Sequence, residues 1–191
     1  TDATYEQTLA AVAAGASVGT HVFNAMRPPH HREPGPVFAL LAAPGVVCEL
    51  VADGIHLHDG TLAFAATVTG AARAALITDA IDAAGIAEGR YELGGQAVVV
   101  TGKAVRLATA DGSPGPIAGS TLTMDAAFRH TVHAGLSVVD AAVMASTTPA
   151  RAIGLAGAVG AIAPGLRADL LVLDSELAVR RVLRAGSWVP R

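Results

Sequence analysis

Short runs of apolar residues alternate with longer segments of helical periodicity from residue 1 to about residue 90. Strands in which almost every residue is apolar have both faces buried, which is typical of a parallel sheet covered by helices. Thr4 and Gln7 have the form of a capping box that opens the first helix, and Gly15 can close it. The pattern predicts an α/β fold built from βαβ units. The other expected elements are strands at residues 18–23, 46–51 and 74–78 and helices at residues 36–43 and 61–68.

The pattern changes after residue 90, where glycine-containing turns separate Val-rich runs. These turns predict a β-hairpin or meander, inserted after the third parallel strand at about residues 90–110. Helical periodicity then returns, with Ser120 as an expected N-cap and with Ser137 and Asp140 as a second capping box. The helices predicted here cover residues 121–134, 137–146 and 149–154.

The last part of the chain carries strand signals only. Strands are expected at residues 168–173 and 179–184, with a short one at Trp188 after a turn. We therefore predict two domains, one over residues 1–159 and a separate small β domain over residues 160–191.

Composition and charge narrow the possible partners. The chain has 191 residues, 52% of them apolar, which suffices for one good-sized core with a small appendage. Its net charge is -3 and it has no basic cluster, which argues against nucleic acid as a partner. Pro44 and Glu49 interrupt the most apolar stretch, so no membrane-spanning helix is predicted. Cys48 is the only cysteine, so an internal disulfide is impossible; a role in core packing and a reducing cytoplasm are expected.

Three polar residues follow the predicted parallel strands. They are His21, His56 and Asp79, each at a strand end or just beyond it. The carboxyl ends of parallel strands are where α/β barrels gather their catalytic groups, because helices cover the flanks. Imidazole and carboxylate groups are ligands that a cation such as Zn²⁺ takes. The pattern therefore favours a metal-dependent active site at this edge.

A series of short motifs carries a family resemblance. The motifs are Thr20–Met26, Arg32–Gly35, Ala52–His56, Thr78–Ala80, Ala118–Met124, Met144–Arg151 and Pro164–Leu170. In this order they resemble the N-acetylglucosamine-6-phosphate deacetylases of the amidohydrolase superfamily. The last motif is common across the superfamily, whereas the first two together are specific. The resemblance covers the whole chain.

The resemblance implies a fold and a reaction. Residues 1–159 would be the C-terminal part of a metal-dependent-hydrolase (β/α)₈ barrel of the TIM type, and residues 160–191 would be strands of a small β-sandwich domain. The reaction would be metal-dependent hydrolysis of the acetamide of N-acetylglucosamine 6-phosphate, in amino-sugar catabolism and cell-wall recycling. The implied cofactor is a divalent metal, zinc. The partner is a phosphorylated amino sugar, and a cytoplasmic homodimer is expected.

The resemblance also implies roles for individual residues. His21 would be a metal ligand. Asp79 would be the general base and then the general acid, and it is also a candidate metal ligand. His56 would contact the substrate near the scissile amide. The substrate-binding residues would be Asn24 and the backbone of Ala25 at the sugar phosphate, Arg32 at the phosphate, and Ile117, Ala118 and Gly119 over the sugar.

Further metal ligands are expected upstream of Thr1. In the family, a glutamate and another histidine also bind the metal, and both precede the stretch that resembles Thr1 onward. Three parallel strands cannot close an eight-stranded barrel. The resemblance therefore implies a fragment with an incomplete metal site, inactive when alone.

Other polar residues have weaker claims to a function. His30 and His31 lie beside Arg32 in a loop, where a second phosphate contact is less expected than simple exposure to solvent. His130 and His133 share a helical face and could chelate a metal. With no carboxylate or cysteine partner expected nearby, a surface or interface role is favoured. The remaining members of this group, His58, Asp82 and Glu88, are expected to be exposed.

Two alternatives stay open. The chain could belong to another amidohydrolase, dihydroorotase-like or adenine-deaminase-like, which would not need the Arg32 loop. It could also be an inactive fragment that acts as a binding or assembly module. Metal content and activity on N-acetylglucosamine 6-phosphate would distinguish these possibilities.

Overall fold

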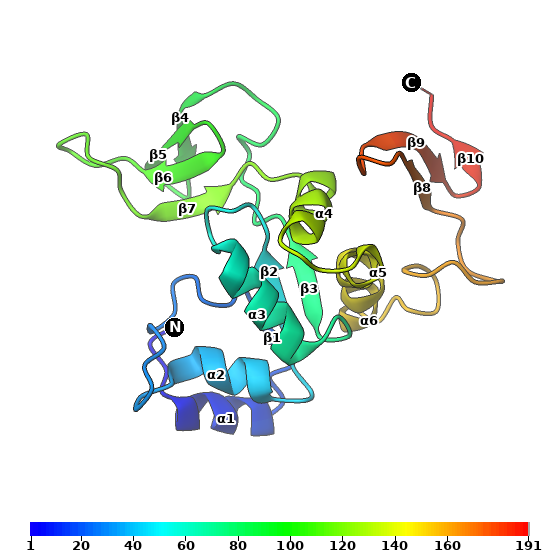
Figure 1. The fold of residues 1–191 in the computed structure, drawn as a ribbon. Helices are drawn as coiled ribbons and strands as arrows, with labels where there is room; N and C mark the ends of the chain where they lie inside the picture. The colour runs from blue at the N-terminus through cyan, green and yellow to red at the C-terminus, as the bar shows by residue number, and fades with distance from the viewer. Residues whose placement is uncertain (191) are drawn as a thin grey trace.

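The structure is a computed structural model that describes residues 1–190. Figure 1 shows three separate groups of strands: a central parallel sheet surrounded by helices, a four-stranded sheet drawn in green, and a C-terminal sheet drawn in orange to red. The central sheet has the order β1-β2-β3, and both pairs are parallel. Its elements are β1 (Val18–Gly19), β2 (Val47–Val51), β3 (Ala74–Ile77), α1 (Tyr5–Ala13), α2 (Gly35–Ala42) and α3 (Asp59–Thr69). The predicted βαβ arrangement is confirmed.

The main core lies between this sheet and its helices. Leu50 of β2 and Leu76 of β3 are register partners, and both side chains are buried. They belong to one apolar cluster with Leu41 from α2 and Leu62 from α3. Since neighbours in a strand point to opposite faces, Glu49 lies on the face opposite to Cys48 and Leu50. One face of β2 therefore packs against helices, and the other is free to carry a charge.

Arg73 fastens the start of β3 to the end of α2. Its guanidinium group donates to the backbone oxygens of Leu41 at 2.9 Å, Ala43 at 2.8 Å and Val46 at 3.2 Å. The last carbonyl groups of a helix lack intrahelical partners and carry a partial negative charge, so a cation is stabilising there.

The first strand is shorter than expected. A strand over residues 18–23 is wrong because β1 ends at Gly19. The backbone then takes positive φ angles at His21 (34°), Phe23 (81°) and Ala25 (51°), which a strand cannot contain. The turn remains hydrogen-bonded to the sheet, since the Val22 N–H donates to the backbone oxygen of Glu49 at 2.9 Å.

The predicted insert is an antiparallel meander of four strands. They are β4 (Gly89–Leu93), β5 (Gln96–Thr101), β6 (Ala104–Leu107) and β7 (Ile117–Ser120). The meander has its own small core, which includes Val98, Val100 and Val105. It extends beyond the expected range because Ile117–Ser120 forms a fourth strand.

Ser120 therefore does not cap a helix, as the sequence led us to expect. Its hydroxyl group donates to the backbone oxygen of Thr78 and accepts from the Leu122 N–H. The N-cap position of the helix that follows is occupied by Thr123 instead. The Ser120 N–H also donates to the backbone carbonyl oxygen of Asp79 at 2.8 Å. Ser120 thus clamps the end of β7 to the chain that leaves β3.

The helices that follow are α4 (Met124–His133), α5 (Val138–Ala142), the π-helical segment η1 (Val143–Thr147) and α6 (Thr148–Ala152). The predicted N-cap of α5 is confirmed, since the Ser137 side chain accepts from the Asp140 N–H at 3.0 Å. The final sheet has the order β10-β9-β8, with β8 (Leu170–Leu173), β9 (Val179–Arg184) and β10 (Ser187–Trp188). The exact domain boundary at residues 159 and 160 remains a prediction. Within residues 1–190, no helix has the length and apolar character to cross a membrane.

Cys48 generates the first prediction. It is fully buried, and burial raises the pKa of its thiol to about 11, although the charge of Arg73 lowers it in part. Since the thiolate is the reactive form, N-ethylmaleimide should leave Cys48 unmodified at pH 8 in the folded protein and modify it in denaturant. Peptide mass spectrometry would measure both. Equal modification in the two states would contradict the packing described for β2.

A second prediction concerns Gly119, whose φ is +87°. A Cβ atom there would lie 2.7 Å from Ile81 Cγ2 and 3.1 Å from the backbone oxygen of Asp79. Gly119→Ala should therefore lower the free energy of unfolding by about 1–3 kcal/mol, measured by denaturant titration. Gly112→Ala is the matched control, because Gly112 has a φ of +75° and nothing within 4 Å of its Cβ position. An equal loss in both variants would show that close packing beside Asp79 contributes nothing.

Candidate active site at the carboxyl ends of the parallel strands

The three parallel strands end at one edge of the sheet, and polar residues follow each of them. His21 lies in the turn after β1, Asp53 and His56 lie in the loop after β2, and Asp79 follows β3. The expected position of these residues along the fold is confirmed. Their chemical roles remain predictions.

Asp53, His56 and Asp79 form a connected group. Asp53 Oδ2 lies 2.7 Å from His56 Nδ1, and His56 Nε2 lies 3.8 Å from Asp79 Oδ2. The side chains of Asp53 and His56 are only 2% and 3% exposed, whereas that of Asp79 is 32% exposed. A buried pair therefore leads to a carboxylate that solvent or a ligand can reach.

The Asp53 carboxylate is stabilised in its charged form. Burial alone would raise its pKa, but hydrogen bonds from the His56 ring and from the N–H groups of His56 and Ile55 lower that pKa below its ordinary value. Both N–H groups donate to Asp53 Oδ1 at 2.8 Å. The sequence motif that contains Asp53 suggested no role for it; its spacing of three residues from His56 was the available signal.

Glu49 is a second charged residue that the sequence reasoning missed. In the sequence it appears only as an interruption of an apolar stretch. Burial raises the pKa of its carboxyl group, the His21 ring and backbone N–H lower it, and the charge of Asp79 raises it. Glu49 is therefore within electrostatic reach of both residues. A lone carboxylate in an apolar strand was the signal that could have identified it.

The backbone around Asp79 is held in an unusual conformation. Asp79 has a φ of +51°, which is uncommon for a residue with a side chain. The hydrogen bonds of Ser120 and the close approach of Gly119 maintain this conformation. Gly119, Ala118 and Ile117 are half-buried in β7, so the structure gives this segment a packing contact with the Asp79 backbone.

Asn24 and Ala25 lie in the turn that carries His21. The Asn24 side-chain amide donates to the backbone oxygen of His21 at 3.2 Å, so it stabilises the turn from within. Ala25 is exposed and has positive φ. Whether either residue contacts a sugar phosphate remains a prediction.

His21 fits a metal ligand. Its Nδ1 atom is buried and has no hydrogen-bond partner among the described residues. An imidazole that the surrounding protein does not fully satisfy is available to a ligand, and imidazole suits zinc. Within residues 1–190, no group of three or more His, Cys, Asp or Glu residues could hold a metal ion by itself.

Thr1 lies against the same turn. Its backbone nitrogen donates to the Ala25 oxygen at 2.6 Å, and its carbonyl oxygen accepts from the Arg27 N–H at 3.0 Å. These two contacts place Thr1 next to the turn that carries His21. The side chain of Thr1 is exposed, so its contribution is to the backbone of the turn. The metal ligands expected upstream of Thr1 remain a prediction.

Arg32 lies in a different place. Its exposed side chain contacts His31 Nε2 at 2.8 Å, and no hydrogen bond or ion pair within residues 1–190 joins it to His21, His56 or Asp79. It lines a cavity of about 390 Å³ that also includes Arg27 and the first residues of α1 and α2. The two guanidinium groups of this cavity attract anions, whereas the carboxyl groups of Glu6 and Glu33 in the same lining oppose them. His30 is exposed, and its ring lies 4.2 Å from the His31 ring at a tilt of 42°.

His130 corrects an expectation. A carboxylate does lie nearby, because His130 Nε2 is 2.8 Å from Asp59 Oδ1 at the start of α3. The His130 ring also packs against Gly54, where a Cβ atom would come within 3.0 Å of it. His130 therefore joins α4 to the loop that carries His56. His133, His58 and Asp82 do not take part in this contact.

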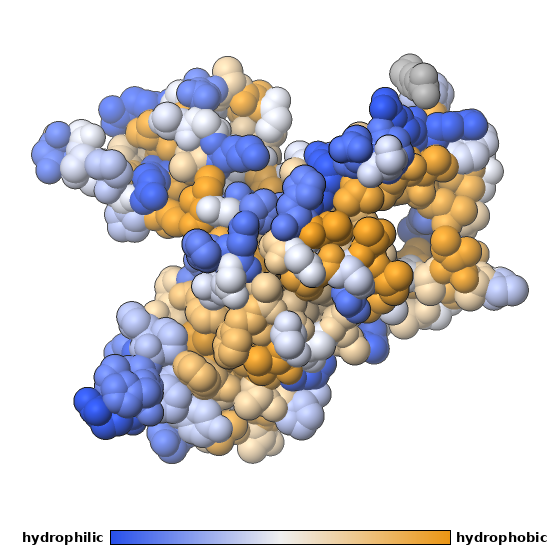
Figure 2. Space-filling model, in the orientation of Figure 1, coloured by the Kyte–Doolittle hydropathy of each residue, from blue (hydrophilic) through white to orange (hydrophobic). Residues whose placement is uncertain are grey.

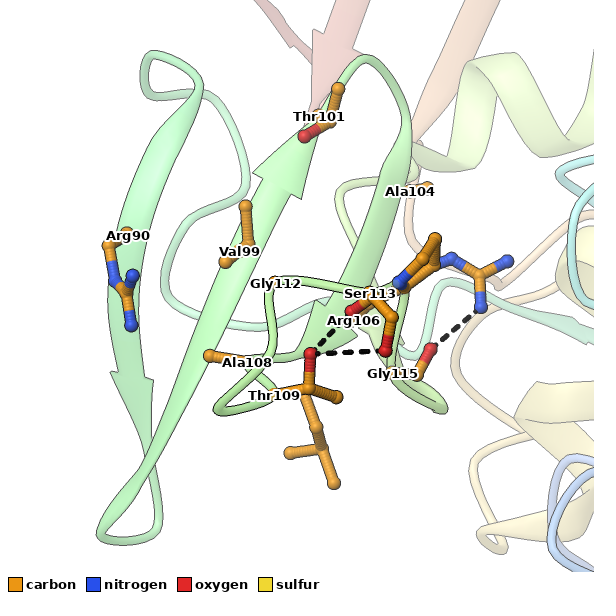
Figure 3. A pocket seen from close by; sticks show the side chains of 12 residues that line it. Arg90, Val99, Thr101, Ala104, Arg106, Ala108, Thr109, Gly112, Ser113 and Gly115 are labelled. Atoms are coloured by element: carbon orange, nitrogen blue, oxygen red, sulfur yellow. Dashed lines mark hydrogen bonds between the residues drawn. The ribbon is translucent and has the colours of Figure 1, made fainter.

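A larger cavity of about 500 Å³ lies on the four-stranded sheet (Figure 3). The loop after β6 folds back to form it, with Arg106 Nη1 donating to the Gly115 oxygen at 2.8 Å. The residues that line it come from β4 to β6 and this loop. None of the predicted site residues is among them.

Known proteins resemble this chain along nearly its full length. The amidohydrolase family model matches residues 1–189. The chain is 43% identical over 185 residues to an N-acetylgalactosamine-6-phosphate deacetylase from Escherichia coli O157:H7, covering 96% of this chain and 48% of that protein. It is 40% identical over 186 residues to an N-acetylglucosamine-6-phosphate deacetylase from Lysinibacillus sphaericus, covering 97% of this chain and 46% of that protein.

A solved structure is similar as well. It is a mutant N-acetyl-D-glucosamine-6-phosphate deacetylase from Mycobacterium smegmatis in complex with N-acetyl-D-glucosamine-6-phosphate, with a TM-score of 0.88 and 46% identity. The match covers 98% of this chain and 49% of that one, so the chain spans about half the length of the relatives it matches. These matches confirm the α/β fold class, part of a TIM-type barrel with strands of a small β-sandwich domain. The chain therefore belongs to the amidohydrolase family.

Proposed function

We propose that this chain is part of an enzyme that hydrolyses the acetamide of N-acetylglucosamine 6-phosphate to glucosamine 6-phosphate and acetate. The observation that carries the proposal is the Asp53, His56 and Asp79 group at the strand ends. The names of the relatives from Lysinibacillus sphaericus and Mycobacterium smegmatis support the substrate. The Arg32–Gly35 motif, which the dihydroorotase-like and adenine-deaminase-like alternatives would not need, argues against those alternatives.

Asp79 is the proposed proton carrier. Its carboxylate takes a proton from the attacking water as the bond from oxygen to the acetyl carbon forms, and it returns that proton to the amine nitrogen as the carbon–nitrogen bond breaks. The partial exposure of Asp79 suits contact with both water and substrate. His56 presents Nε2 to the substrate beside the scissile amide.

The family implies a divalent metal, which we propose to be zinc. When bound, it would polarise water and the acetyl carbonyl group. His21 would supply one ligand, and Asp79 is a candidate for another. A catalytic zinc site usually has three protein ligands, so we propose that the remaining ligands come from a segment that corresponds to the unmatched half of the relatives.

We call this chain together with that segment the assembled enzyme.

Exposed apolar residues support this assembly. Figure 2 shows apolar surface over α5 and α6 and on the facing side of β8 and β9. Exposed side chains there include Val139 at 71%, Ile153 at 70% and Leu171 at 58%. A cluster of this kind is usually covered by another part of a protein.

We also propose that the assembled enzyme is a cytoplasmic homodimer that serves amino-sugar catabolism and cell-wall recycling.

Substrate recognition is proposed to involve Arg32 at the phosphate, helped by Asn24 and Ala25, while Ile117–Gly119 lie over the sugar. A guanidinium fork suits a phosphate group. The relative from Escherichia coli O157:H7 is named for the galactosamine epimer, so the C4 configuration of the sugar needs its own test.

The direct test measures acetate release by the metal-loaded assembled enzyme. N-acetylglucosamine 6-phosphate should be hydrolysed with a higher kcat/KM than N-acetylgalactosamine 6-phosphate or unphosphorylated N-acetylglucosamine. Dihydroorotate and adenine serve as control substrates. Turnover of either control, or a preference for the galactosamine epimer, would reject the proposed substrate, and inactivity on all of them would favour a binding module.

Asp79→Asn in the assembled enzyme should lower kcat at least about a hundredfold, because proton transfer typically contributes roughly 10²–10⁴. Substrate affinity and thermal stability should change little. Asp82→Asn is the matched control, since Asp82 is a carboxylate in the same loop that belongs to no ion pair of the site. Near-normal turnover of the Asp79 variant would show that another group is the base.

Arg32→Ala should raise KM for the phosphorylated sugar about ten- to a hundredfold, the value of one charge-assisted bidentate contact. The preference over the unphosphorylated sugar should narrow by the same factor. Arg90→Ala removes a charge from the other cavity and is expected to leave both sugars unaffected. Equal losses on both sugars in the Arg32 variant would mean that Arg32 does not read the phosphate.

A further inference from the structure

We propose that Asp53 is a positioning residue that acts through His56. Its carboxylate fixes the orientation of the imidazole ring and keeps a proton on Nδ1, so that Nε2 is the nitrogen presented to Asp79 and to the substrate. The catalytic consequence rests on the proposed deacetylase function. The protonation pattern of His56 does not depend on that function and can be measured separately.

Both oxygens of Asp53 are committed. Oδ1 accepts from the N–H groups of Ile55 and His56, each at 2.8 Å, which folds the loop after β2 into a tight turn. Oδ2 pairs with His56 Nδ1 at 2.7 Å. The carboxylate therefore cannot rotate away from the ring without breaking the loop.

Burial makes this contact decisive for the ring. The Asp53 and His56 side chains are 2% and 3% exposed, so water does not compete for Nδ1. An ionised carboxylate can only accept hydrogen bonds, so Nδ1 must donate. The opposite nitrogen, Nε2, is 3.8 Å from Asp79 Oδ2, beyond a direct hydrogen bond, and is left for a reacting group.

The surrounding loop is held from a second side. Gly54 has a φ of +74° and contacts the His130 ring, and His130 pairs with Asp59. This support comes from α3 and α4 and does not involve the His56 ring. The positioning effect of Asp53 on the ring can therefore be separated from the general integrity of the loop.

Asp53→Asn is the informative variant. The Asn carbonyl oxygen can keep both backbone hydrogen bonds, but its amide group would donate to Nδ1 and move the ring proton to Nε2. In the assembled enzyme we expect kcat to fall about ten- to a hundredfold, as is typical when the partner that orients a functional histidine is removed. We expect KM to stay within about threefold of normal.

Protonation is read directly by ¹⁵N NMR of the histidine-labelled assembled enzyme, with His56→Gln used to assign the signals. The native protein should carry its proton on Nδ1 of His56, and the Asp53→Asn protein on Nε2. Asp59→Asn is the matched control, because it neutralises the carboxylate of an exposed Asp–His pair of 2.8 Å, keeps an oxygen that can accept from His130, and leaves the buried pair intact. It should alter neither kcat nor the His56 signals.

The outcomes separate the claims. A native His56 with its proton on Nε2 and none on Nδ1 would overturn the proposal, even if the Asn variant failed to fold. A lower kcat without the change in protonation would also overturn it, since Asp53 would then be merely structural. If the ring proton moves as expected but the native enzyme releases no acetate, the positioning role stands and the proposed function fails.

Discussion

Parallel pairing of β1, β2 and β3 is the constraint on which the rest of the site depends. Because Val18 pairs with Val47 and Cys48 pairs with Ala74, the three strands end at the same edge. Helices bury one face of β2, so polar groups can occur only on the other face or beyond the strand ends. The positions of His21, His56 and Asp79 follow from this arrangement.

Holding charged groups at such an edge requires support from outside the strands. Asp53 stays ionised despite burial because three hydrogen bonds converge on it. Asp79 keeps an unusual backbone because Ser120 and Gly119 of the meander pack directly against it. The inserted sheet therefore contributes to the candidate site through backbone contacts, even though its own cavity lies elsewhere.

The regular elements of the fold could be predicted because their signals are local. The capping box of Thr4 and Gln7 and the cap of Ser137 depend on residues three apart, and both occur as expected. The prediction for Ser120 was wrong because a capping pattern in the sequence cannot reveal that the end of β3 lies close enough to accept a hydrogen bond from the Ser120 hydroxyl group. The same limit applies to the candidate site. Strand ends could be located from periodicity, whereas the pairing of His130 with Asp59 joins residues on different helices, and no local pattern encodes it. Glu49 was missed because its proximity to His21 and Asp79 depends on which face of β2 it occupies.

The central claim is that the strand ends of this chain form one half of a metal-dependent deacetylase site. Anomalous X-ray diffraction at the zinc edge, from crystals of the assembled enzyme soaked with N-acetylglucosamine 6-phosphate, tests it most directly. The account predicts an ion ligated by His21 and a sugar whose acetamide lies between that ion and Asp79. An ion bound away from His21, or a sugar seated in the cavity of the four-stranded sheet, would contradict it.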